Sequence, residues 1–405
     1  MDSPQSLETR KIGWKKTILF SLLPLVILLG LSEGAARILE RWFPPAPIDF
    51  GNGFDSNTRL FIPDENTPGT LITNPRKRRT FETHSFKDPK PQGTLRIVVI
   101  GESSIARLDE ELQAMAARMQ RSVGPSGPVI EVLNAGGRAY GSQRLLIVAT
   151  EMAAYQPDAV VVYMGHNEFE EVEQLVVTFP ETSALQESLA GSALVRLSRD
   201  RLLAFQLRLL QDDHNKRILS RQRPSHARAW KYKFTREDVE TRMTAFRGNL
   251  QHIVQLFKQG GVPVIIGTIP SNLVKPYLPE EAQASYAPVW QLLEQRKYAE
   301  AEALGKQVLR DAVGRHQSSP RENEIIRAIA ADNQLPVADV EAVITRAEPH
   351  GVPGETLFSD HCHLNAEGNK ILAATLEEKL REVLKLGSVN APVPSLPRQE
   401  GAHQP

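Results

Sequence analysis

The feature that most constrains the fold is a repeated alternation of uninterrupted apolar strands and helical segments that begins near residue 95. The strands read LRIVVIG, PVIEVLNAG, PDAVVVYMG and VPVIIGTIP, and segments with helical spacing, such as ELQAMAARMQRSV and SQRLLIVATEMAAY, separate them. Strands that are apolar on both faces are typical of parallel sheets covered by helices on both sides. We therefore predict an α/β fold of three layers, with a central parallel sheet between helices.

Polar residues gather where the predicted strands end. The first strand runs into GESS, the second into NAGGRAYGS and the third into GHNEF, while SDHCHLNAEGNKILA stands near the C-terminus. In open parallel sheets, ligands bind at the carboxyl ends of the strands. We therefore expect the chemistry of this chain to lie just after residues 100, 134, 164 and 268.

The order and spacing of these blocks resemble those of the SGNH or GDSL hydrolase family. GESS resembles the first block and implies Ser103 as the nucleophile, with Glu102 standing where the family usually has aspartate. Asp360 and His363, spaced as Asp-x-x-His, resemble the last block. The resemblance implies His363 as the general base, Asp360 as the acid that orients it, and a flavodoxin-like arrangement of the sheet and helices.

The two middle blocks imply an oxyanion hole. In the second block a backbone N–H usually serves that hole, and the position falls on Ala139, or on Gly137 or Gly141 if the turn has a different register. GHNE resembles the third block, with the Asn167 side chain as a further donor and Glu168 in place of the second acid. The resemblance covers about residues 95–168 and 245–385.

The proposed roles fit the chemistry of these residue types. A serine hydroxyl is a weak nucleophile at neutral pH and needs an imidazole to take its proton, with an acid behind the imidazole to stabilise the cation. Ser103, His363 and Asp360 would fill these roles. Attack on an acyl carbon places negative charge on oxygen, and the N–H groups of Ser103 and Ala139 with the Asn167 amide would hold that charge.

Each assignment has a structural alternative. Ser104 would cap the helix that follows the first strand, and Asn167 would cap a helix starting at Phe169. Asp360 and His363 would be an N-cap and a surface histidine. These alternatives need no catalytic function.

Neither a metal nor a cofactor is predicted. His166 and His361 accompany His363, but one histidine pair with scattered carboxylates falls short of a metal-binding signature. Cys362 is interpreted as a packing residue, and as the single cysteine it excludes a disulfide within the chain.

The N-terminus, residues 1–44, is predicted to be a signal-anchor. Four basic residues precede TILFSLLPLVILLGL, an uncharged run, and AARILERWF extends this run with an aromatic pair suited to a membrane interface. A cleaved signal peptide is the alternative, and a buried core helix is less favoured because of the flanking charges. Positive residues stay cytoplasmic, so the rest of the chain is expected on the extracytoplasmic side, periplasmic or at the cell surface, and secreted if the segment is cleaved.

The remaining chain is divided as follows. Residues 45–94 are predicted to form a linker and peripheral segment with at most an edge strand, in which the RKRR run is a solvated face or contacts anionic lipid. Residues 95–386 form the hydrolase-like domain, and residues 387–405 have the composition of a disordered tail.

Two insertions interrupt the predicted domain. The first, at about residues 169–235, leaves the carboxyl end of a strand and is expected to form a lid or substrate wall, or else a face for a partner or the membrane. The second, at about residues 280–320, has a helical hairpin whose pattern is similar to a tetratricopeptide unit. A lone repeat must dock on something, so it is expected to pack on the hydrolase domain, with protein-partner binding as a further option.

Charge excludes one class of partner. The chain has 48 Lys and Arg residues and 48 Asp and Glu residues, so its formal net charge is zero and no global field favours nucleic acid.

The sequence therefore predicts a membrane-anchored serine hydrolase that cleaves ester-linked acyl groups from glycans, small esters or lipids, as an esterase or carbohydrate O-deacetylase. The alternatives are an envelope O-acyltransferase with the same triad and a non-catalytic protein that keeps the fold for binding or assembly.

Overall fold

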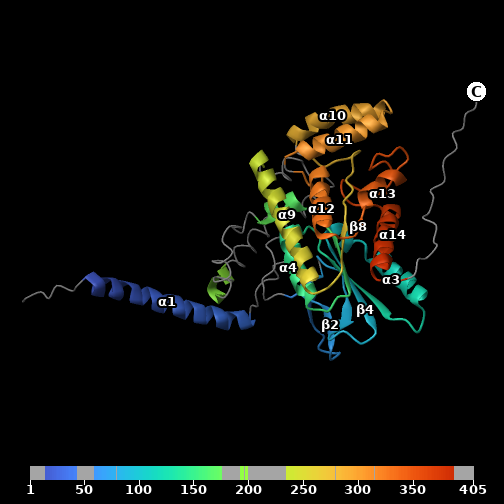
Figure 1. Ribbon diagram of the computed structural model, residues 1–405. Coiled ribbons are helices and arrows are strands. Elements are labelled where there is room, and N and C mark those ends of the chain that lie inside the picture. Colours follow the sequence, from blue (N-terminus) through green and yellow to red (C-terminus); the bar gives the residue numbers. More distant parts are fainter. Residues whose placement is uncertain are drawn as a thin grey trace, which may run out of the picture. The chain divides into compact units, whose positions relative to one another are not determined.

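The computed structural model describes eight segments of the chain, and Figure 1 labels their helices and strands. By its internal contacts the chain divides into two units, residues 1–50 with 179–222 and residues 51–178 with 223–405, and each is described by itself. The described residues are 14–42, 59–78, 80–175, 192–195, 197–198, 234–278, 280–313 and 315–386.

The second unit is built around a five-stranded parallel sheet, which confirms the predicted fold class. Its spatial order is β5-β4-β6-β7-β8, with every neighbouring pair parallel. The register places Gly101 opposite both Gly136 and Tyr163, so three strands end at one level. The strands are β4 (Thr94–Gly101), β5 (Val129–Gly136), β6 (Ala159–Tyr163), β7 (Val264–Gly267) and β8 (Val337–Ala338).

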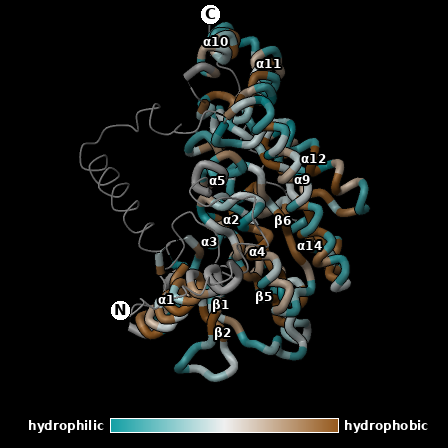
Figure 2. The backbone as a smooth tube through the Cα atoms, turned by 90° about the vertical axis from the view of Figure 1, so that its left-hand side faces the viewer, coloured by the Kyte–Doolittle hydropathy of each residue, from teal (hydrophilic) through white to brown (hydrophobic). Residues whose placement is uncertain are grey.

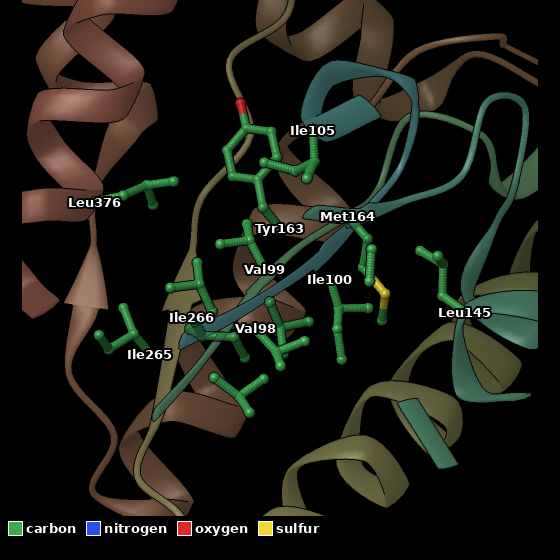
Figure 3. Close-up of a cluster of buried hydrophobic side chains, with 14 of the residues drawn as sticks. Val98, Val99, Ile100, Ile105, Leu145, Tyr163, Met164, Ile265, Ile266 and Leu376 are labelled. Atoms are coloured by element: carbon green, nitrogen blue, oxygen red, sulfur yellow. The ribbon is translucent and has the colours of Figure 1, made fainter. Parts of the chain in front are cut away.

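Helices cover both faces of the sheet (Figure 1). One layer holds α4 (Ser142–Ala153), α9 (Arg236–Gln259) and α12 (Pro320–Asn333), and the other holds α3 (Asp109–Val123), α13 (Val340–Ala347) and α14 (Ala366–Val383). Figure 3 shows side chains of the central strands between Leu376 of α14 and Leu145 of α4. Strands packed on both faces explain the continuous apolar runs in the sequence.

The segment before β4 is more structured than predicted. Within residues 45–94, β1 (Phe61–Pro63), β2 (Thr70–Thr73) and β3 (Ser85–Lys87) form an antiparallel sheet. Phe61, Phe81 and Phe86 are buried in the main core, and the backbone N–H of Phe61 donates to the Glu151 carboxylate of α4. In the RKRR run, η1 (Pro75–Lys77) ends at a buried Lys77. Strands of three or four residues leave too little periodicity to be read from sequence.

The second insertion contains the expected helical hairpin. In it α10 (Glu280–Glu294) and α11 (Tyr298–Asp311) lie side by side (Figure 1) and share a small core with Leu273 and Val352 of the surrounding domain. The Tyr286 hydroxyl of α10 donates to the Leu273 carbonyl at 2.7 Å, which ties the hairpin to the chain that follows β7. The hairpin therefore packs on the domain.

The first unit contains α1 (Trp14–Trp42). Its segment Leu22–Glu40 is long and apolar enough to cross a membrane, a property that signal sequences share, and Figure 2 shows the hydrophobic residues along α1. Part of the first insertion belongs to this unit: the Glu33 carboxylate accepts hydrogen bonds from the Ser192 hydroxyl at 2.7 Å and from the Ala193 N–H at 2.9 Å.

The ends of the first insertion lie in the second unit. Its first residues continue α5 (Glu168–Leu175), and its last lead into α9. Residues 199–233 and the predicted tail at 387–405 lie outside the described residues. The lid interpretation of the insertion therefore stays a prediction.

Candidate active site

A tight turn at the end of β4 presents Ser103. The strand ends at Gly101, and Ser103 is the first residue of the short helix α2 (Ser103–Ala106). A Cβ added at Gly101 would lie 2.4 Å from the Tyr163 carbonyl oxygen, and one at Gly136 would lie 2.3 Å from the Ala106 nitrogen. Only glycine therefore lets α2 lie directly against the ends of the neighbouring strands.

Ser103, His363 and Asp360 form a hydrogen-bonded line. His363 Nε2 lies 2.8 Å from Ser103 Oγ, and His363 Nδ1 lies 2.7 Å from Asp360 Oδ2. Asp360 Oδ1 also accepts the backbone N–H groups of Cys362 and His363, at 3.0 and 2.8 Å. The structure thus brings together the three residues that the sequence assigns to nucleophile, base and acid.

The electrostatic environment keeps Asp360 ionised. Burial by itself raises the pKa of this carboxyl, but the hydrogen bonds from the His363 side chain and from the backbone N–H groups of Cys362 and His363 lower it well below its usual value. A carboxylate facing Nδ1 places the imidazole proton on that nitrogen and leaves Nε2 as the acceptor for the serine proton.

The neighbouring Glu102 connects two of the sequence blocks. Its carboxylate accepts the backbone N–H groups of His166 at 2.7 Å and Asn167 at 3.1 Å. Burial, and next the charge of Glu168, raise the pKa of Glu102. Glutamate in the usual aspartate position is therefore a structural link between the turn that carries Ser103 and the one that carries Asn167.

The helix-cap alternative does not hold for Ser104, whereas Asn167 directly precedes α5 and also contacts the turn after β5. Glu102 is the N-cap residue of α2, and within the described residues the buried Ser104 hydroxyl has no hydrogen-bond partner. The Asn167 amide Nδ2 donates to the Tyr140 carbonyl at 3.2 Å, across to the turn after β5. An amide carries two N–H groups, so a second donor remains beside the site.

The backbone around residue 139 favours one of the three oxyanion candidates. Gly137 N–H donates to the Gly101 carbonyl, and Gly141 N–H donates to Glu171 Oε1 at 3.0 Å. Among the described residues, neither Ala139 N–H nor Ser103 N–H has a protein acceptor. Ala139 has φ +61°, the left-handed conformation that glycine adopts most easily. The geometry therefore favours Ala139 over both glycines.

Two further titratable groups near the triad, His166 and Cys362, have pKa values shifted toward their neutral forms by burial. His166 is buried, its Nδ1 accepts the Ser318 N–H at 3.1 Å, and burial lowers its pKa. Burial likewise raises the thiol pKa of Cys362, whose Sγ lies 3.4 Å from His363 Nδ1. Ligand atoms of Asp360, Cys362 and His363 lie close enough to hold an ion, but the His363–Asp360 hydrogen bond already explains their proximity.

The lowered pKa of His361 predicts that the fold becomes less stable at acidic pH. Burial lowers its pKa from 6.5 to about 4, so between these values the unfolded chain takes up a proton that the folded chain does not. Stability should therefore fall as the pH drops through this window. We expect His361→Gln to reduce the loss of unfolding free energy between pH 7.5 and 4.5 by about 2 kcal/mol, measured by urea denaturation. His252→Gln, at an exposed histidine, is the control. If the unfolding free energy of wild type and His361→Gln depended on pH in the same way, His361 would not be the source of the acid sensitivity.

Sequence reasoning missed one part of the site, a buried cluster of two glutamates and two arginines behind the turn at 137–142. It consists of Arg144, Glu168, Glu171 and Arg242. The spacing of Glu168 and Glu171, one helical turn apart directly after Asn167, was the available signal.

No family model and no curated protein matches the sequence. Among solved structures, the chain is similar to a GDSL-like lipase from Bacteroides thetaiotaomicron, at 11% identity and TM-score 0.38 over 73% of this chain and 91% of that one. It is also similar to an acetyl xylan esterase (14%, TM-score 0.36, 70% and 98%) and to an alpha/beta hydrolase enzyme from the metagenome of Lake Arreo, Spain (14%, TM-score 0.34, 73% and 97%). Such distant likenesses assign no activity to this chain.

Proposed function

We propose that this chain is a membrane-anchored serine hydrolase of the SGNH or GDSL type that cleaves an ester-linked acyl group. The observation that carries the proposal is the line Ser103–His363–Asp360, with contacts of 2.8 and 2.7 Å, at the carboxyl end of a parallel sheet. A binding protein has no need for a serine hydroxyl aligned on an imidazole that is itself aligned on a carboxylate.

The reaction follows from the positions of these groups. Ser103 Oγ attacks the acyl carbon while His363 Nε2 takes its proton, and the Asp360 carboxylate stabilises the imidazolium. The oxygen that gains charge is held by the N–H groups of Ser103 and Ala139 and by the Asn167 amide, each donor contributing about 3 to 4 kcal/mol. The tetrahedral intermediate then expels the alcohol, which takes the proton from His363, and leaves the acyl group on Ser103.

The second half-reaction uses the same groups. Water gives a proton to His363 Nε2, its oxygen attacks the acyl carbon, and Ser103 leaves with that proton restored. A sugar hydroxyl in place of water would complete an acyl transfer instead. We propose hydrolysis, in which water accepts the acyl group. An assay with and without a sugar acceptor distinguishes it from acyl transfer.

The anchor part of the proposal is supported by α1. Leu22–Glu40 has a mean hydropathy of 1.8, and its large apolar side chains, among them Phe20 just before it and Leu28 and Leu31 within it, are exposed in the first unit. Basic residues precede this helix, so the positive-inside rule would place the chain after it outside the cytoplasm.

One experiment tests activity and anchoring together. Full-length protein in carbonate-washed membranes is assayed with p-nitrophenyl esters of increasing chain length and with acetylated glycans, with and without a sugar acceptor. We expect ester hydrolysis that sediments with the membranes. Activity recovered only in the supernatant would contradict the anchor, and no turnover with any ester or acceptor would favour the non-catalytic alternative.

A further inference from the structure

A buried ion cluster lies directly behind the turn that carries Ala139. Arg144 Nε lies 2.8 Å from Glu171 Oε1, and Arg242 Nη2 lies 2.5 Å from Glu168 Oε2 and 2.9 Å from Glu171 Oε2. All four side chains are at most 8% exposed. Four charges that cancel in pairs can be buried together, whereas removal of one would leave another uncompensated.

Stability alone is a weak reason for such a cluster. Buried ion pairs are often no better for stability than apolar side chains of the same volume, because both charges must leave water. The parallel sheet beside this cluster is filled with apolar side chains, so the same volume could have been filled in that way. We therefore look for its role in fixing the geometry of the neighbouring backbone.

The cluster holds the backbone after β5 from one side. Glu171 accepts the N–H groups of Gly141 at 3.0 Å, Gln143 at 3.0 Å and Arg144 at 3.1 Å, and Glu168 accepts the N–H and hydroxyl groups of Ser142 at 2.7 and 2.8 Å. These contacts occupy the first N–H groups of α4, where a helix has unpaired donors. The start of α4 is thus fixed to α5, the helix that begins directly after Asn167.

Arg144 also contacts Ala139, whose N–H is the proposed oxyanion donor. Its Nη2 donates to the Ala139 carbonyl oxygen, while its Nε faces Glu171. On the other side of Ala139, the Arg138 N–H donates to the Thr80 carbonyl at 3.0 Å. These two contacts hold the Gly137–Arg138 and Ala139–Tyr140 peptide groups. The peptide group between them carries the Ala139 N–H, so its direction is restricted from both sides.

The conformation at Ala139 explains why it needs to be held. A non-glycine residue at φ +61° is strained, and it keeps this conformation only where its surroundings impose it. A guanidinium oriented by a carboxylate offers a charge-assisted hydrogen bond in a fixed direction, which a lysine ammonium cannot do for both partners.

We propose that Arg144 is a positioning residue of the oxyanion hole: it holds the Ala139 carbonyl and thereby directs the Ala139 N–H at the developing oxyanion. Arg144 touches the turn and not the reacting atoms, so it acts through Ala139. The inference rests on the proposed hydrolase function and adds a residue that the family blocks do not contain.

The test compares Arg144→Met and Arg144→Lys in full-length, detergent-solubilised protein, with active sites counted by fluorophosphonate titration so that only folded enzyme enters kcat. We expect Arg144→Met to lower kcat by about 10- to 100-fold with KM changed less than threefold, because a misdirected donor affects the transition state more than the bound ester. The kcat of Arg144→Lys should lie between those of wild type and Arg144→Met, because lysine keeps the positive charge but lacks the planar guanidinium group that binds both partners.

A second substitution separates positioning from general destabilisation. Glycine adopts φ +61° without strain, so Ala139→Gly in the Arg144→Met background should raise kcat at least threefold over Arg144→Met alone. Arg381→Met is the matched control, because Arg381 is also buried and paired with a glutamate, Glu377 at 2.7 Å, but on α14. We expect its kcat to stay within twofold of wild type.

The outcomes are distinct. A wild type that neither hydrolyses esters nor reacts with fluorophosphonate would overturn the proposed function, and the role of Arg144 with it. An active wild type would overturn the positioning role alone if Arg144→Met kept kcat within twofold, if Arg381→Met lost as much, or if Ala139→Gly gave no rescue.

Discussion

Replacing Ser103 with alanine is expected to lower kcat for ester hydrolysis by about a million-fold, to the level that binding and oxyanion donors sustain without a nucleophile. The reason is that no acyl-enzyme can form when Oγ, 2.8 Å from His363 Nε2, is absent. The same change should abolish labelling by a fluorophosphonate probe, which bonds covalently to an activated serine. Labelling followed by gel fluorescence, together with initial rates on a p-nitrophenyl ester, measures both effects.

The adjacent serine provides the matched control. Ser104 is buried in the same short helix, and within the described part of the chain its hydroxyl bonds to nothing. Ser104→Ala removes the same atom one residue away and should keep both labelling and turnover close to wild type. Equal labelling of wild type and Ser103→Ala would remove Ser103 from the mechanism, and loss of labelling only in Ser104→Ala would move the nucleophile by one residue.

Asp360→Asn is expected to lower kcat by about ten thousand-fold with the fold intact. Asparagine can keep an oxygen at the position of Oδ1, which accepts the N–H groups of Cys362 and His363. Its NH₂ then replaces Oδ2 and presents a donor to His363 Nδ1. The imidazole must turn to the tautomer that carries its proton on Nε2, and in that form it cannot take the proton of Ser103.

The measurement pairs steady-state kinetics with far-UV circular dichroism and thermal unfolding. A catalytic role predicts that kcat falls while KM and the unfolding temperature change little, and that fluorophosphonate labelling slows in parallel with kcat. Asp158→Asn, at a carboxylate that accepts the backbone N–H of Arg96 at 2.6 Å far along the strand from the site, controls for loss of a backbone hydrogen bond. A kcat for Asp360→Asn within tenfold of wild type would exclude Asp360 as the orienting acid.

Local signals explain which parts of the fold were predictable. The strands β4, β5, β6 and β7 are runs of apolar residues buried on both faces, and such runs need no knowledge of distant residues. The antiparallel sheet of β1, β2 and β3 was not predicted beyond an edge strand. Its phenylalanines, Phe61 and Phe86, are separated by turns in the sequence, and they pack into a core formed by distant residues, where Phe61 N–H also donates to Glu151 of α4.

The same distinction holds for the candidate site. Ser103, Asn167, Asp360 and His363 each lie in a short block at a strand or helix end, so the blocks could be recognised one by one. The charged cluster is different, because Glu168 meets Arg242 across 74 residues of sequence and Ser142 across 26. No local pattern marks an arginine in the second turn of a 24-residue helix as the partner of those glutamates.

Asp360 and His363, the proposed acid and base, come from one four-residue segment of the loop before α14, whereas Ser103 is 260 residues away from His363 in sequence. The contact between imidazole and carboxylate is therefore encoded locally and belongs to the loop itself. The contact between imidazole and serine depends on how that loop is seated against the rest of the domain. Partial loosening of the domain would separate these two contacts in time, with the hydroxyl leaving the imidazole while the acid–base pair is still assembled. The distance between Ser103 and His363 is thus the one at which we expect the proposed triad to come apart first.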